Sequence, residues 1–151
     1  MEEKSIIDRL SDDLKAAMKA RDTDRMATLR MAISAMNYRR IERNTALSKE
    51  EQEDVLRKQV KQREDSIAEF TKGARKDLAD KELREREILK EYLPPELSAQ
   101  QLQAEVSGIL AGLGPEAKFA DAMKAVMPVL QKRANGKAIQ EAVKAAMAGR
   151  S

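Results

Sequence analysis

Leu93-Pro94-Pro95-Glu96 interrupts a sequence of 151 residues at about two-thirds of its length. Two consecutive prolines cannot continue an α-helix, and Leu93 before them is pushed toward an extended conformation. The residues before this point form long, charged segments, whereas those after it form shorter segments that are rich in alanine. We therefore expect two domains, an N-terminal domain over residues 1–93 and a C-terminal domain over residues 94–151.

Apolar residues upstream of the prolines recur every three or four positions, which is the spacing of one helix face. Breaks at 21–24, 44–45 and 73 divide this pattern and predict an array of four helices. Ser48 followed by Glu51 is a capping-box pattern that begins the third helix. The three clearest apolar stripes are Ile6, Ile7, Leu10, Leu14 and Ala17; Met26, Leu29, Ile33, Met36 and Ile41; and Leu56, Val60, Ile67 and Phe70.

Downstream of the prolines the pattern predicts three short helices. Ser98 with Gln101 is a second capping box. Turns are expected at 112–115 and 134–136, and Pro128 should bend or end the middle helix. The sequence therefore predicts an all-α fold, in which a four-helix array precedes a small three-helix domain similar to a ubiquitin-associated domain.

The composition excludes several classes of site. The chain contains no Cys and no His, which excludes thiol nucleophiles, Ser-His-Asp triads and zinc-finger ligand sets. A phosphate-binding glycine loop is also missing, so we expect no metal and no cofactor. The longest uncharged stretch, residues 106–115, has ten residues, far fewer than the ~20 of a membrane helix. Met1-Glu2-Glu3 is acidic where a signal peptide is basic. We expect a soluble cytoplasmic protein that does not contact membranes.

One charged cluster interrupts the apolar pattern of the N-terminal domain. Arg63 occupies a position in the apolar stripe of the third helix, and Glu82 and Glu85 lie on the apolar side of the fourth. A buried guanidinium needs a partner. Two interpretations stay open for these residues together with Arg75. The first is a structural clamp between the two helices, and the second is a polar pocket that takes an anion.

Basic residues gather near the C-terminus, where a turn precedes the last helix. A helix N-terminus flanked by lysines can bind anions, so one interpretation is contact with the phosphates of a nucleic acid. The other is that these lysines only solubilise a small helical domain. The chain has too few aromatic residues to stack many unpaired bases, which favours a structured RNA recognised by shape. The candidate residues are Lys124, Lys132, Arg133, Asn135, Lys137 and Lys144.

Several short motifs occur together and in order along the chain. They are Lys61-Gln62-Arg63-Glu64-Asp65-Ser66, Phe70, Arg75, Asp77-Leu78, Glu85 and Tyr92-Leu93-Pro94, with Leu29-Arg30 before them and Met127-Pro128 after them. In this set the sequence resembles the YqeY family across essentially its whole length. That family is similar to the tail of the B subunit of the glutamine-dependent tRNA amidotransferase, and the same module is appended to some glutaminyl-tRNA synthetases. The segment 118–124 departs from the family, because both of its expected glycines are replaced.

The resemblance implies a role with tRNA and, by inheritance, the label of a carbon–nitrogen ligase with glutamine as amide donor. The catalytic parts of the amidotransferase lie outside this tail, so we expect a tRNA-binding accessory module that is not catalytic by itself. The implied partners are tRNA and either glutaminyl-tRNA synthetase or amidotransferase subunits, with no DNA. Two alternatives stay open: a component of such a ligase, and a protein-interaction module without RNA binding.

Overall fold

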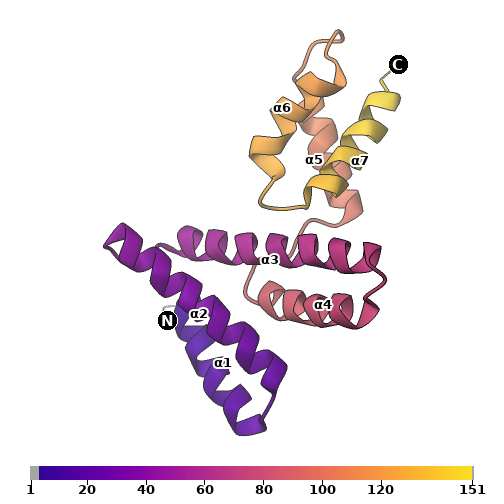
Figure 1. Ribbon diagram of the computed structural model, residues 1–151. Coiled ribbons are helices and arrows are strands. Elements are labelled where there is room, and N and C mark those ends of the chain that lie inside the picture. Colours follow the sequence, from indigo (N-terminus) through magenta and orange to yellow (C-terminus); the bar gives the residue numbers. More distant parts are fainter. Residues whose placement is uncertain (1–3, 151) are drawn as a thin grey trace. The chain divides into compact units, whose positions relative to one another are not determined.

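The computed structural model describes residues 4–150, and in this range the chain forms seven α-helices and no β-strand (Figure 1). The all-α prediction is therefore confirmed. The helices are α1 (Ile6–Ala20), α2 (Thr23–Arg43), α3 (Lys49–Lys72), α4 (Lys76–Lys90), α5 (Ala99–Ala111), α6 (Phe119–Leu130) and α7 (Gly136–Ala148). The chain divides into two compact units, residues 1–94 and residues 95–151.

The N-terminal unit consists of two helical hairpins. Helix α1 packs along α2, and α3 packs along α4 (Figure 1). Both hairpins contribute to one apolar core, in which the side chains of Leu10, Leu29, Leu56 and Leu89 are fully buried. Most residues of the predicted stripes lie in this core or against it, because each helix has one apolar face and only a shared centre removes all four faces from water. Ile67 and Phe70, at the end of the α3 stripe, are partly buried outside that cluster.

Side-chain caps fix where two of the helices begin, as the sequence predicted. The Glu51 amide donates to Ser48 Oγ over 3.1 Å, and the Ser48 amide donates to Glu51 Oε1 over 3.2 Å. Ser98 and Gln101 form the equivalent pair at the start of α5, with distances of 3.1 and 3.0 Å. Each box satisfies backbone N–H groups that the first turn of a helix leaves without partners.

The structure differs from the predicted pattern at the end of α2. Ile41 was expected on the buried stripe of α2, but it is 72% exposed. The buried face of α2 ends at Met36, so the last two turns of the helix extend beyond the core. Helix α3 ends at Lys72, in agreement with the predicted break at residue 73. The left-handed residue at this end is Ala74 (φ 58°), and Gly73 before it has an ordinary φ of −82°.

The C-terminal unit is a three-helix bundle with a core of its own, to which Val106, Val126 and Ile139 contribute fully buried side chains. Pro128 lies inside α6, which ends two residues later at Leu130. The Leu97 amide donates to the Arg133 carbonyl over 2.9 Å, which ties the start of the unit to the turn between α6 and α7. Across residues 4–150, no helix combines the length and the apolar character needed to cross a membrane.

Candidate functional site

The charged cluster of the N-terminal unit lies between α3 and α4. Arg63 Nη1 donates to Glu82 Oε2 over 3.0 Å and also to Glu85 Oε2. The side chains of Arg63 and Glu85 are only 11% and 7% exposed. Lys81 Nζ lies 3.8 Å from Glu85 Oε1 at the more exposed edge of the cluster. One guanidinium therefore bonds to two carboxylates, and the lysine supplies the second positive charge that balances them.

This arrangement is typical of a structural clamp. An anion that entered the cluster would compete with two carboxylates for Arg63, and it would meet their negative charge at close range. Arg75, which we had grouped with these residues, lies elsewhere. It is exposed and donates from Nε to its neighbour Asp77 over 3.3 Å, and this hydrogen bond lowers the pKa of Asp77.

A second polar contact joins the last residues of the same unit to its first helix. The buried Tyr92 donates its hydroxyl to Asp13 of α1, and the Arg9 guanidinium carbon lies 5.0 Å from the centre of the tyrosine ring. Burial, followed by the hydrogen bond to Asp13, raises the pKa of the Tyr92 hydroxyl. The residue before Leu93-Pro94 is therefore anchored to the first helix as a hydrogen-bond donor, which is a structural role.

The basic candidates of the C-terminal unit all lie at its surface. Lys132 and Arg133 lie in the turn between α6 and α7, and Lys124 is on α6. Lys137 and Lys144 lie on α7 seven residues apart, opposite its buried residues Ile139, Ala142 and Val143. A rise of about 1.5 Å per residue separates their positions by about 10 Å along the helix. These two lysines therefore share the outward face of α7.

Three features of this surface reduce its net positive charge or occupy its hydrogen-bond donors. Arg133 Nη1 lies 3.7 Å from Glu105 Oε1 of α5. Asn135 acts as the N-cap of α7, because its Oδ1 accepts from the Ala138 amide over 2.8 Å. Glu141 lies between the two lysines of α7, four residues after one and three before the other, where helix side chains are neighbours. The surface is therefore basic at its turn and mixed along the helix.

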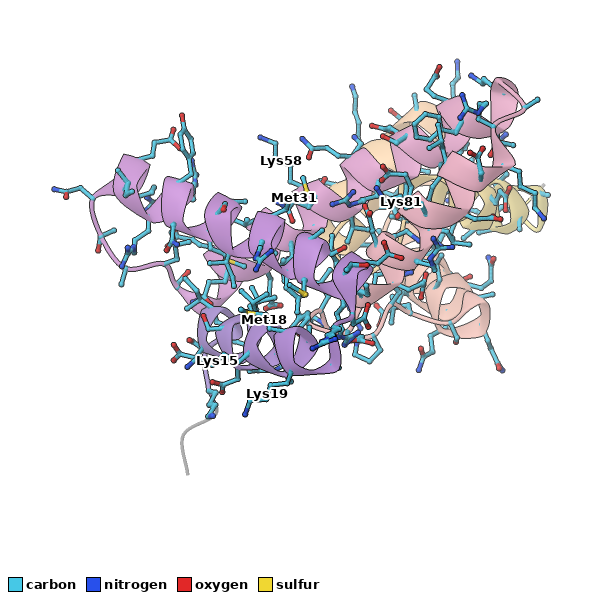
Figure 2. All side chains as sticks on the ribbon, turned by 60° about the horizontal axis from the view of Figure 1, so that its bottom comes forward. Lys15, Met18, Lys19, Met31, Lys58 and Lys81 are labelled. Atoms are coloured by element: carbon cyan, nitrogen blue, oxygen red, sulfur yellow. The ribbon has the colours of Figure 1, made fainter. Side chains whose placement is uncertain are left out.

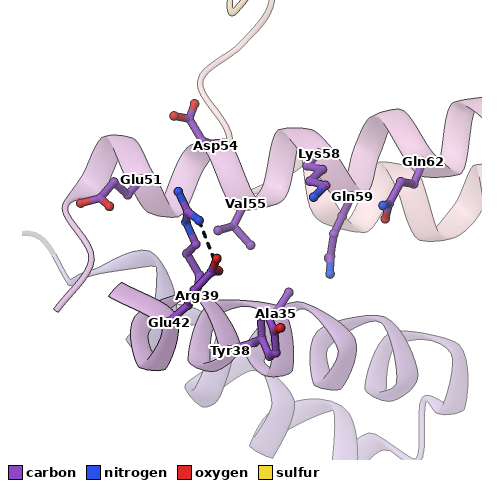
Figure 3. Close-up of a pocket in the computed structure, with 10 residues that line it drawn as sticks. All are labelled: Ala35, Tyr38, Arg39, Glu42, Glu51, Asp54, Val55, Lys58, Gln59 and Gln62. Atoms are coloured by element: carbon purple, nitrogen blue, oxygen red, sulfur yellow. Dashed lines mark hydrogen bonds and ion pairs between the residues drawn. The ribbon is translucent and has the colours of Figure 1, made fainter. Parts of the chain in front are cut away.

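The structure also contains a groove that our sequence analysis missed. It encloses about 460 Å³ between the second half of α2 and the first half of α3 (Figure 3). Tyr38 and Ala35 form part of one wall, and Val55, Lys58 and Gln59 form part of the other. A second set of positions on α2, with alternating spacings of four and three beginning at Ala27, runs beside the groove and contributes Tyr38 to its wall. This set is less apolar than the stripe that forms the core, so it is the weaker of the two patterns in the sequence.

Within residues 4–150, no group of three or more carboxylates is arranged to hold a metal ion. The fold and these sites therefore define an all-α protein of two helical units, whose polar clusters contribute to structure and surface charge. The chain belongs to the Yqey-like protein family, whose sequence model matches residues 7–147. This match confirms the family resemblance indicated by the motifs.

The chain is similar to curated yeast proteins named altered inheritance of mitochondria protein 41, mitochondrial. It is 37% identical to the protein of Lachancea thermotolerans over 123 residues, which are 78% of this chain and 66% of that protein. It is 39% identical to the protein of Kluyveromyces lactis over 107 residues, which are 69% of this chain and 58% of that protein. The chain thus spans about three-fifths of the length of these relatives.

These names contradict our expectation of a cytoplasmic protein, because the relatives are mitochondrial. Composition and hydropathy indicate only whether a domain suits water or lipid, and aqueous compartments make similar demands on a protein surface. Our expectation rested on hydropathy and on the acidic start Met1-Glu2-Glu3, and neither property distinguishes the cytoplasm from the aqueous interior of an organelle.

Proposed function

We propose that the chain is a tRNA-binding accessory module that contacts RNA phosphates through its C-terminal unit. The observation that carries this proposal is the placement of the basic residues. Lys132 and Arg133 lie in the turn before α7, and Lys137 and Lys144 continue along the outward face of that helix. The similarity of the family to the tail of a tRNA amidotransferase subunit identifies tRNA as the RNA to test first.

The surface suits contact with phosphates rather than the reading of bases. Among the described residues of the C-terminal unit, Phe119 is the one aromatic residue, and it is 36% exposed at the start of α6. Stacking on unpaired bases needs several exposed rings, whereas flexible lysines can follow the backbone of a folded RNA. The proposal therefore predicts binding that depends on charge and shape and varies little with sequence.

Fluorescence anisotropy with labelled bulk tRNA tests the proposal in the full chain. If these four cations contact phosphates, the logarithm of the affinity should fall with the logarithm of salt concentration with a slope of about −3 to −4, taking roughly 0.7–0.9 per phosphate. Lys137→Glu with Lys144→Glu should weaken binding to all tRNAs about equally and reduce that slope. A duplex DNA of equal charge should bind more weakly.

The matched control reverses two exposed lysines on the other unit, Lys15 and Lys19 of α1 (Figure 2). This variant carries the same change in net charge, so it shows whether position or total charge matters. Equal loss of affinity in both double variants, or binding that does not respond to salt, would refute the placement of the RNA on α7.

A further inference from the structure

Helix α2 has a second stripe on the face that points away from the core. Its positions alternate by four and three residues: Ala27, Met31, Ser34, Tyr38 and Ile41. All five are exposed, and the three large ones are 55%, 74% and 72% exposed in chain order. A 4–3 repeat of this kind is the pattern by which one helix packs along another. Helix α3 contacts this stripe at Met31, yet each of the three large side chains stays more than half exposed.

The groove beside this stripe supplies a second wall from α3. Gln59 Nε2 donates to the Met31 carbonyl over 3.3 Å, and Arg63 Nη2 lies 3.5 Å from Met31 Sδ. These contacts hold the two helices together at Met31, while the groove opens toward Tyr38 (Figure 3). Gln59 Oε1 is buried and accepts no hydrogen bond from the described residues.

We propose that this stripe and groove form a docking site for an amphipathic α-helix of a partner protein, with acidic residues flanking the apolar stripe of that helix. Small and large residues alternate from Ala27 through Met31 and Ser34 to Tyr38, and Ile41 follows as a further large side chain. Such alternation leaves spaces into which the side chains of a second helix can insert. An occupant that lies between α2 and α3 would contact both walls and cover more apolar surface than one lying on α2 alone.

The charges around the site indicate the acidic character of the partner. Each acidic residue that lines the groove already has an ion pair with an arginine of this chain: Glu42 with Arg39, Glu51 with Arg43 and Asp54 with Arg57. In contrast, Lys58 on the α3 wall and Arg30 beside the stripe have no ion-pair partner among residues 4–150. Figure 2 shows Lys58 extending from the surface of the same unit as Met31.

A second copy of this chain fits the site less well. The same face of another molecule would add two more unpaired cations, while the acidic residues that line its groove are already paired with arginines. Like charges across an interface oppose association. A helix with acidic flanks would instead place carboxylates beside both cations, which favours association and selects against basic helices.

A designed peptide tests this proposal on the full chain. The probe is a fluorescein-labelled peptide of three heptads, with Leu and Ala in a 4–3 stripe and Glu at the flanking positions. Its partner peptide has the same stripe with Lys at the flanks. Anisotropy should show that the acidic peptide binds about tenfold or more tightly than the basic one, and Lys58→Glu should reduce this preference.

Tyr38→Ala with Ile41→Ala should weaken binding of the acidic peptide by about tenfold or more, because exposed aromatic and aliphatic anchors dominate such interfaces. Both residues are exposed, so circular dichroism should show unchanged helix content. Val129→Ala, which removes a side chain that is 55% exposed on the other unit, is the matched control and should bind the peptide as the native chain does.

Three results would overturn the proposal. The first is equal affinity for the acidic and basic peptides. The second is unchanged affinity in the Tyr38/Ile41 double variant. The third is evidence for another occupant of the site. Loss of a dimer in sedimentation equilibrium in that variant would indicate a second copy of the chain, and loss of tRNA binding in the anisotropy assay would indicate RNA. Loss of tRNA binding through α7 variants alone would leave the docking site supported, because those variants lie in the other unit.

Discussion

Replacement of Arg63 by Met tests whether the charged cluster between α3 and α4 is a clamp. The change removes the cation shared by Glu82 and Glu85 and leaves an apolar side chain of similar length. Breaking a buried ion pair on one side costs about 3–5 kcal/mol, because the remaining charge stays out of water. Lys81 can still approach Glu85, since its Nζ is 3.8 Å from the carboxylate. We therefore expect a cost near the lower limit, about 3 kcal/mol.

The complementary change, Glu85→Leu, should cost less. Arg63 keeps its 3.0 Å hydrogen bond to Glu82, whose side chain is 20% exposed, so the guanidinium is not left alone. We expect a loss of about 1–2 kcal/mol. In the double variant two apolar side chains replace the pair, and such replacements are often neutral or stabilising. A double-mutant cycle should therefore give a coupling energy of about 2 kcal/mol or more.

Urea unfolding followed by tyrosine fluorescence measures the unfolding free energy of the N-terminal unit, because both tyrosines, Tyr38 and Tyr92, lie in residues 1–94. Arg75→Met is the matched control. That side chain is 59% exposed, so its loss should change the unfolding free energy by less than about 0.5 kcal/mol. Additive effects of the two cluster variants, or a marked rise of the urea midpoint with phosphate at constant ionic strength, would refute the clamp and favour the anion pocket.

Three further changes have defined outcomes. Ala74→Gly should stabilise the N-terminal unit by about 0.5–1 kcal/mol in urea unfolding, because Ala74 holds a φ of 58° that glycine adopts without strain; a loss of stability would contradict this reasoning. Gln52→Leu should cost about 2 kcal/mol, because its side chain joins the Ile7 amide and the Leu47 carbonyl over 3.0 Å each; an unchanged urea midpoint would show that these bonds contribute nothing. Hydrogen bonding from the Ser48 amide lowers the pKa of Glu51 from about 4.5, so this carboxylate stabilises the fold above that pH and the benefit is lost as pH falls through the lowered pKa. Acid titration of the unfolding free energy should therefore bring the native chain and Glu51→Gln together at low pH, and a constant difference between them would exclude this linkage.

Local chemistry made the helices predictable. Ser48 with Glu51 and Ser98 with Gln101 each place a side-chain acceptor three residues before a reciprocal partner, so these two starts depend on neighbours in sequence alone. The pairing of Arg63 with carboxylates on the next helix was also accessible, since an arginine within an apolar stripe needs a partner. Arg75 could not be placed in the same way, because an exposed cation has several partners within reach and it pairs with its own neighbour Asp77.

The sequence by itself determined the all-helical fold, the positions of the capped helix starts and the apolar faces that form the two cores. These properties depend on spacings of three and four residues and on hydrogen bonds within one turn. Only the tertiary structure decided which of the two stripes on α2 is buried and that Ile41 lies outside the core. It also decided that α2 and α3 separate beyond Met31 and leave a groove. The physical reason is that side chains project from all sides of a helix, and the side that becomes buried depends on where the other helices lie and end.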